Sequence, residues 1–140
     1  MSKLSVVSIE KNGIIKVGNY LYERGEYMPQ TMSNLIQEYV TAIRKIYGTH
    51  LKQVILYGSY ARGDFNADSD VDIMVLVDLP EERLNSFSDE LSELGFDYNV
   101  THDIWFMPVV KNIEHFQYWR QAYPFYSNVA KEGISLYEAA

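Results

Sequence analysis

The 140-residue chain contains no cysteine, which excludes disulfides and thiolate metal sites and is typical of a reducing compartment. Basic residues are also scarce: 12 Lys and Arg stand against 19 Asp and Glu, a net charge of −7. This balance argues against a protein that mainly grips a nucleic-acid backbone. No apolar run reaches the length of a membrane span, and the N-terminus lacks a signal-peptide apolar region. We therefore expect a cytoplasmic protein, and the length predicts one main domain.

Residues 1–30 stand apart as an N-terminal extension, and residues 31–140 are expected to form the main domain. In the extension, Asn12-Gly13 separates two apolar runs, which is a strong signal for a β-hairpin. The hairpin has two open interpretations. It is either a dimer or partner surface, or an extra hairpin packed on the edge of the domain.

The main domain has the pattern of an α+β fold in which a small mixed sheet is flanked by helices. Apolar periodicity predicts helices over 32–47, 79–94, 112–122 and 125–132, and strands over 53–57, 70–77, 98–107 and 134–137. The link between the first two strands is short, which favours antiparallel pairing because a parallel crossover usually needs a dozen or more residues.

The most informative motif joins those two strands. Gly58-Ser59 ends the first strand, and glycine lets a phosphate or another backbone approach closely. Asp70 and Asp72 begin the second strand and lie on one face of it because strand side chains alternate. Taken alone, Gly58-Ser59 is explained as a common turn, and the Asp70-Val71-Asp72 segment as a loop cap. The two features together, at this spacing, favour a nucleotide site. Since adjacent carboxylates repel unless a cation lies between them, we expect two Mg²⁺ or Mn²⁺ ions here, with ATP as substrate.

Two segments resemble the signature of the DNA polymerase β-like nucleotidyltransferases. They are residues 58–63, with the sequence Gly-Ser-Tyr-Ala-Arg-Gly, and residues 68–73, with the sequence Asp-Ser-Asp-Val-Asp-Ile. The short chain is most similar to the minimal nucleotidyltransferases, which act as antitoxins beside HEPN-domain toxins. The resemblance covers roughly residues 33–138 and implies a polymerase β-like core with two metal-binding aspartates in the motif. It also implies a third on a later strand.

The best candidate for that third carboxylate is Asp103, in the strand expected over 98–107, where a metal would explain an acid among apolar residues. Asp97 is the second candidate, although its place after Gly95-Phe96 favours a turn. Gly58 and Ser59 would seat phosphates. Arg62 either meets phosphate or braces Asp64 or Asp68, and Ser69 either contributes to nucleotide binding or fixes its own loop.

These residues predict a metal-dependent nucleotidyltransferase that moves AMP from ATP to a protein hydroxyl, with Asp70, Asp72 and Asp103 as catalytic metal ligands. By resemblance alone, the acceptor is a tyrosine on a HEPN-type ribonuclease toxin, which the modification would silence. Two alternatives remain open. One is a small-molecule nucleotidyltransferase with an aminoglycoside-like acceptor, and the other is a toxin-binding antitoxin that needs no catalysis.

Overall fold

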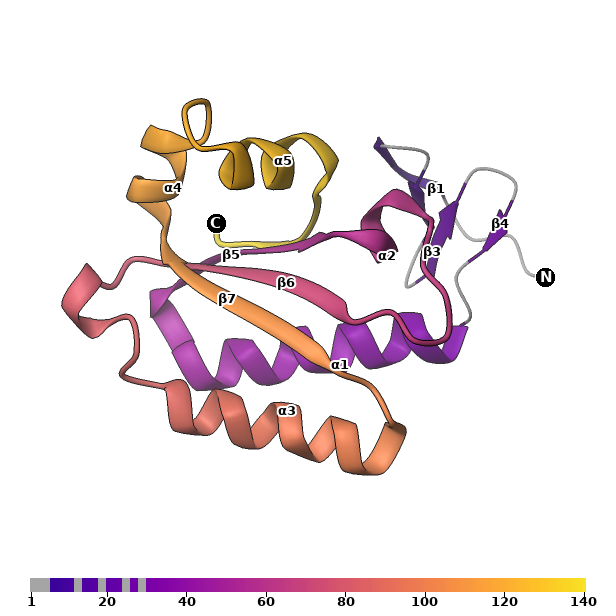
Figure 1. The fold of residues 1–140 in the computed structure, drawn as a ribbon, viewed down its shortest axis with the longest axis horizontal. Helices are drawn as coiled ribbons and strands as arrows, with labels where there is room; N and C mark the ends of the chain where they lie inside the picture. Colours follow the sequence, from indigo (N-terminus) through magenta and orange to yellow (C-terminus); the bar gives the residue numbers. More distant parts are fainter. Residues whose placement is uncertain (1–5, 12–13, 18–19, 24–25, 28–29) are drawn as a thin grey trace.

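The computed structural model describes residues 6–11, 14–17, 20–23, 26–27 and 30–140, the first thirty by their backbone alone. Two four-stranded sheets are present in these ranges (Figure 1). The N-terminal sheet has the order β1-β2-β3-β4, and the main sheet has the order β7-β6-β5-β8. No helix in the described ranges combines the length and the apolar character needed to cross a bilayer.

The N-terminal sheet is an antiparallel meander. Its strands are β1 (Val6–Lys11), β2 (Ile14–Val17), β3 (Tyr20–Glu23) and β4 (Glu26–Tyr27). Lys11 pairs with Ile14, which confirms the expected hairpin at the level of its strands. The turn residues Asn12 and Gly13 lie outside the described residues. Two further strands extend the hairpin beyond what the sequence predicts.

The main sheet is mixed, as expected. Its strands are β5 (Leu51–Tyr57), β6 (Val71–Val77), β7 (Phe106–Asn112) and β8 (Ile134–Glu138). β5 pairs antiparallel with both β6 and β8, while β6 and β7 run parallel. The short 3₁₀ turn η1 (Gly48–His50) leads into β5, and the short helix α2 (Ser59–Arg62) follows it. The antiparallel β5–β6 pair brings the end of β5 next to the start of β6.

Helices cover both faces of this sheet (Figure 1). On one face lie α1 (Gln30–Tyr47) and α3 (Ser88–His102), and on the other lie α4 (Ile113–Trp119) and α5 (Pro124–Glu132). Alternation along β6 divides its side chains between two clusters: Ile73 and Val75 pack with α1, whereas Met74 and Leu76 pack with α4 and α5. Asp72 shares the face of Met74, so it points toward the layer that contains α5.

The segment before β7 differs from the prediction. The 3₁₀ turn η2 (Glu81–Arg83) replaces the start of the expected helix, and α3 begins only at Ser88 and runs through Gly95 to His102. The strand expected over 98–107 is therefore wrong, and β7 starts at Phe106. Packing explains the longer helix, because Leu91, Leu94 and Tyr98 follow helical spacing and contact the core on the α1 side. Tyr98 meets the ring of Tyr39 edge-to-face at 5.8 Å between centroids.

Candidate active site

The turn between β5 and α2 is built around Gly58. Its φ of +75° lies in the region that only glycine adopts readily, and a Cβ at this position would collide with the Asp72 carboxylate. The N–H groups of Ala61 and Arg62 both donate to the Gly58 carbonyl at 3.0 Å, which begins α2. The half-buried Ser59 lies at the start of this helix, where the first N–H groups have no intrahelical partner. The Gly58 turn and the Asp72 carboxylate therefore lie against each other.

Asp70 and Asp72 form the acidic part of the site. Asp72 is the second residue of β6 and pairs with Tyr57 at the end of β5, while the exposed Asp70 directly precedes the strand. Burial raises the pKa of Asp72, and the nearby charges of Asp70 and Glu132 raise it further, whereas Arg62 lowers it. Burial and the charge of Asp72 also raise the pKa of Tyr57 to about 12. Ionising Asp72 is costly because its carboxylate is partly buried and lies near that of Asp70. A bound cation would offset this repulsion.

Arg62 and Ser69 are held by protein partners. The Arg62 guanidinium donates to Asp64 and to Glu132, each at 3.2 Å, so it braces Asp64 as one reading of the sequence predicts. The Ser69 hydroxyl accepts from the Asn66 N–H at 2.8 Å and fixes the loop before Asp70. Contact of either side chain with a nucleotide stays a prediction.

Glu132 is the residue that sequence reasoning missed. Its Oε1 accepts from the Gly58 N–H at 3.1 Å and from Arg62, although it lies 74 positions from Gly58 at the end of α5. A Glu-Gly pair that ends a helix before a strand was the available signal, but it gave no indication of a contact with the motif.

Neither candidate for the third carboxylate lies where the sequence predicts. Asp103 is an exposed residue in the left-handed conformation (φ 56°) that ends α3, so its predicted strand position is wrong, and Asp97 is an exposed residue inside α3. Met107 occupies the position on β7 that pairs with Asp72. Among the described residues, no three Asp, Glu, His or Cys side chains are grouped so that they could hold a metal ion. Asp70 and Asp72 therefore remain the candidate metal ligands, and their carboxylate oxygens suit Mg²⁺ or Mn²⁺.

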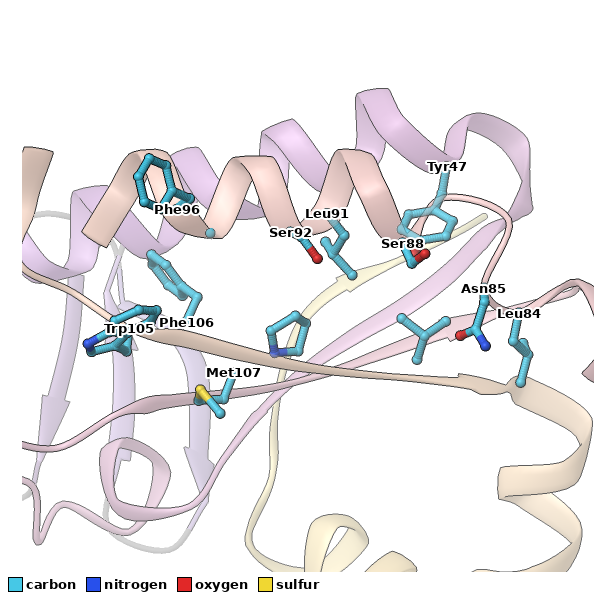
Figure 2. Close-up of a pocket in the computed structure, with 13 residues that line it drawn as sticks. Tyr47, Leu84, Asn85, Ser88, Leu91, Ser92, Phe96, Trp105, Phe106 and Met107 are labelled. Carbon is cyan, nitrogen blue, oxygen red and sulfur yellow. The ribbon is translucent and has the colours of Figure 1, made fainter. Parts of the chain in front are cut away.

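A groove of about 570 Å³ runs between α3 and β7 (Figure 2). The exposed side chains of Phe96, Trp105 and Met107 line it, together with small polar and apolar groups. Its lining has no charged side chain that could bind a triphosphate. Met107 pairs with Asp72, so the groove lies one strand away from the two aspartates. Nucleotide binding at the turn and the two aspartates stays a prediction.

The sequence matches a known protein family. The sequence profile of the nucleotidyltransferase domain matches residues 36–132, which include the turn, both aspartates and Glu132. This chain belongs to the nucleotidyltransferase domain family. As a nucleotidyltransferase it is an enzyme, and its mixed sheet flanked by helices is the fold that the motif predicts.

Relatives of this nucleotidyltransferase are found in Methanocaldococcus jannaschii. It is 33% identical over 102 residues to "Putative protein adenylyltransferase MJ0604", covering 73% of this chain and 94% of that protein. It is 34% identical over 77 residues to "Putative protein adenylyltransferase MJ0141", covering 54% of this chain and 75% of that protein. Among solved structures, a chain of a toxin–antitoxin crystal structure with AMP-PNP aligns over 74% of this nucleotidyltransferase and 73% of its own length, with 19% identity and a TM-score of 0.46.

Proposed function

We propose that this nucleotidyltransferase transfers AMP from ATP to a hydroxyl group of another protein. The observation that carries the proposal is the contact between the Gly58–Ser59 turn and the Asp72 carboxylate, with Asp70 beside it. The names of the two M. jannaschii relatives support adenylyl transfer to protein rather than to a small molecule.

The residues divide the chemistry between them. Asp70 and Asp72 would hold a Mg²⁺ or Mn²⁺ ion, and such an ion would supply charge neutralisation at the triphosphate and at the departing pyrophosphate. Among the described residues, no third acidic, histidine or cysteine side chain joins this pair to form a larger metal-binding group. The Ser59 hydroxyl lies at the turn, where it donates to phosphate oxygen. The acceptor oxygen forms a bond to the α-phosphorus as the bond from that phosphorus to the bridging oxygen breaks, and the hydroxyl proton passes to solvent.

The acceptor we propose is a tyrosine of a HEPN-type ribonuclease toxin, which makes the chain an antitoxin that silences the toxin by AMPylation. The support for this acceptor is the resemblance of residues 58–63 and 68–73 to the minimal nucleotidyltransferases. A neighbouring reading frame that encodes a HEPN protein with an Arg-x₄-His motif would add to it.

Labelled ATP tests the proposal. The protein is incubated with Mg²⁺, the product of the adjacent reading frame, and ATP labelled at either the α- or the γ-phosphate. We expect the α-label to become protein-bound and the γ-label to remain in solution. Protein labelled from the γ-position would indicate a kinase, and the absence of protein-bound label from either position would contradict AMP transfer to this protein acceptor.

A further inference from the structure

The carboxylate of Glu132 is placed on the nucleotide-binding turn by three parts of the fold. Gly133 follows it, and a Cβ at Gly133 would collide with the Val129 carbonyl oxygen and with Ile55 Cγ2, so only glycine lets the end of α5 approach β5 this closely. The Gly133 N–H donates to the Val129 carbonyl at 2.8 Å. The next residue, Ile134, begins β8 and pairs with Leu56 in β5. The backbone on both sides of Glu132 is therefore fixed against the strand that ends at the turn.

From this position the carboxylate contacts two parts of the motif. Its Oε1 accepts from the Gly58 N–H at 3.1 Å and from Arg62 Nη1 at 3.2 Å. Bonds from an N–H to a carboxylate are stronger than bonds between neutral groups, and this one holds the only residue of the turn whose φ requires glycine. Arg62 is pulled toward Glu132 by the same oxygen. The side chain of Glu132 is only 22% exposed, so solvent competes weakly for these bonds.

The two bonds also occupy two donors of the motif. The Gly58 N–H and one nitrogen of Arg62 are already occupied, whereas the Ser59 hydroxyl on the same turn has no partner among the described contacts and is half-buried. We propose that Glu132 is a positioning residue for nucleotide binding: it holds the Gly58–Ser59 turn against Asp72, so that the Ser59 hydroxyl meets the phosphates. This inference rests on the proposed function, because it concerns the same site.

Titration calorimetry with Mg²⁺ and AMP-PNP tests this role without an acceptor. Glu132→Ala removes both bonds, and the dissociation constant should rise about 10- to 100-fold, the usual effect of losing a group that orients binding residues. Glu132→Gln keeps a carbonyl acceptor for the Gly58 N–H but loses the charge, so its dissociation constant should lie between those of the wild type and Glu132→Ala. The number of sites per chain should stay at that of the wild type in both variants. In a transfer assay the same variants should raise KM for ATP with little change in kcat.

Asp64→Asn is the matched control. It removes the other carboxylate bound to Arg62 but leaves the Gly58 N–H bonded to Glu132, so the dissociation constant should stay within about threefold of the wild-type value, as for an exposed ion pair. Should Glu132→Ala fail to fold, Glu132→Gln carries the test alone.

Three results would overturn the inference. One is an unchanged dissociation constant in the folded variants, and another is tighter binding, which would mean that Glu132 blocks the turn. The third is a smaller number of sites at an unchanged dissociation constant, which would mean that Glu132 only supports folding. If the wild-type protein binds no AMP-PNP, the proposed function itself fails, and the inference fails with it.

Discussion

Asp72 belongs both to a buried strand and to the candidate site. It lies in a strand whose other residues are buried, and its carboxylate contacts the glycine turn. Burial and the charge of Asp70 raise its pKa above the ordinary 3.8, so ionisation costs folding free energy. The cost is absent at a pH below 3.8, where the carboxyl is protonated in both folded and unfolded chains, and it is fully present at neutral pH.

Asp72→Asn should therefore raise the thermal unfolding midpoint in metal-free buffer at pH 7, and the difference from wild type should vanish near pH 3. AMP transfer should fall at least about 100-fold, since the variant loses an electrostatic contributor at the reacting phosphate. Scanning calorimetry at both pH values and labelled-ATP transfer measure the two effects. Asp68→Asn makes the same change on an exposed side chain nearby and should not move the midpoint. Full transfer activity in Asp72→Asn would remove the metal-site argument.

At the scale of the element, periodicity locates most of the fold. The helix expected over 32–47 is α1, the motif strands are β5 and β6, and the last helix and strand are α5 and β8. The errors lie where local signals oppose tertiary contacts. Gly95 suggested a helix end, but the contact between Tyr98 and Tyr39 favours another two turns of helix. The link between Glu132 and Gly58 could not be predicted, because nothing in a single sequence pairs residues so far apart.

Gly95 offers a test of this explanation. It lies inside α3, and a Cβ there would meet nothing within 4 Å. Gly95→Ala should stabilise the protein by about 0.8–1 kcal/mol, because alanine loses less backbone freedom in a helix than glycine does. Urea unfolding measures the change. Gly58→Ala is the opposing control, since its Cβ would collide with Asp72, and it should destabilise. A destabilised Gly95→Ala variant would argue that α3 does end near residue 95.

At Asp103 the sequence prediction and the structure give different expectations for a mutant. If it lay on a strand as a metal ligand, Asp103→Asn should abolish AMP transfer in the same way as Asp72→Asn. In the structure it is the exposed left-handed residue that ends α3, a conformation that asparagine also tolerates. We therefore expect Asp103→Asn to keep transfer activity and stability close to wild type. Loss of transfer in a normally folded Asp103→Asn protein would restore the third-ligand prediction.

For the whole molecule, the candidate site forms only when the fold is complete. It joins the end of β5, the start of β6 and the end of α5, which are brought together by the antiparallel pairing of β5 with both β6 and β8. An unfolded chain has no such convergence, so a ligand of the site binds only the folded state and must stabilise it.

Mg²⁺ with AMP-PNP at 100 times its dissociation constant should thus add about 2.7 kcal/mol of stability. For a chain of this size that is a rise of roughly 10 °C in the unfolding midpoint. Thermal unfolding followed by circular dichroism measures it, and Asp70→Asn should lose the shift because one of the two carboxylates no longer holds the cation. If the ligand does not raise the unfolding midpoint of the wild-type protein, these three segments do not form a nucleotide site. If Asp70→Asn shows a shift equal to that of the wild type, the nucleotide binds without the aspartate pair.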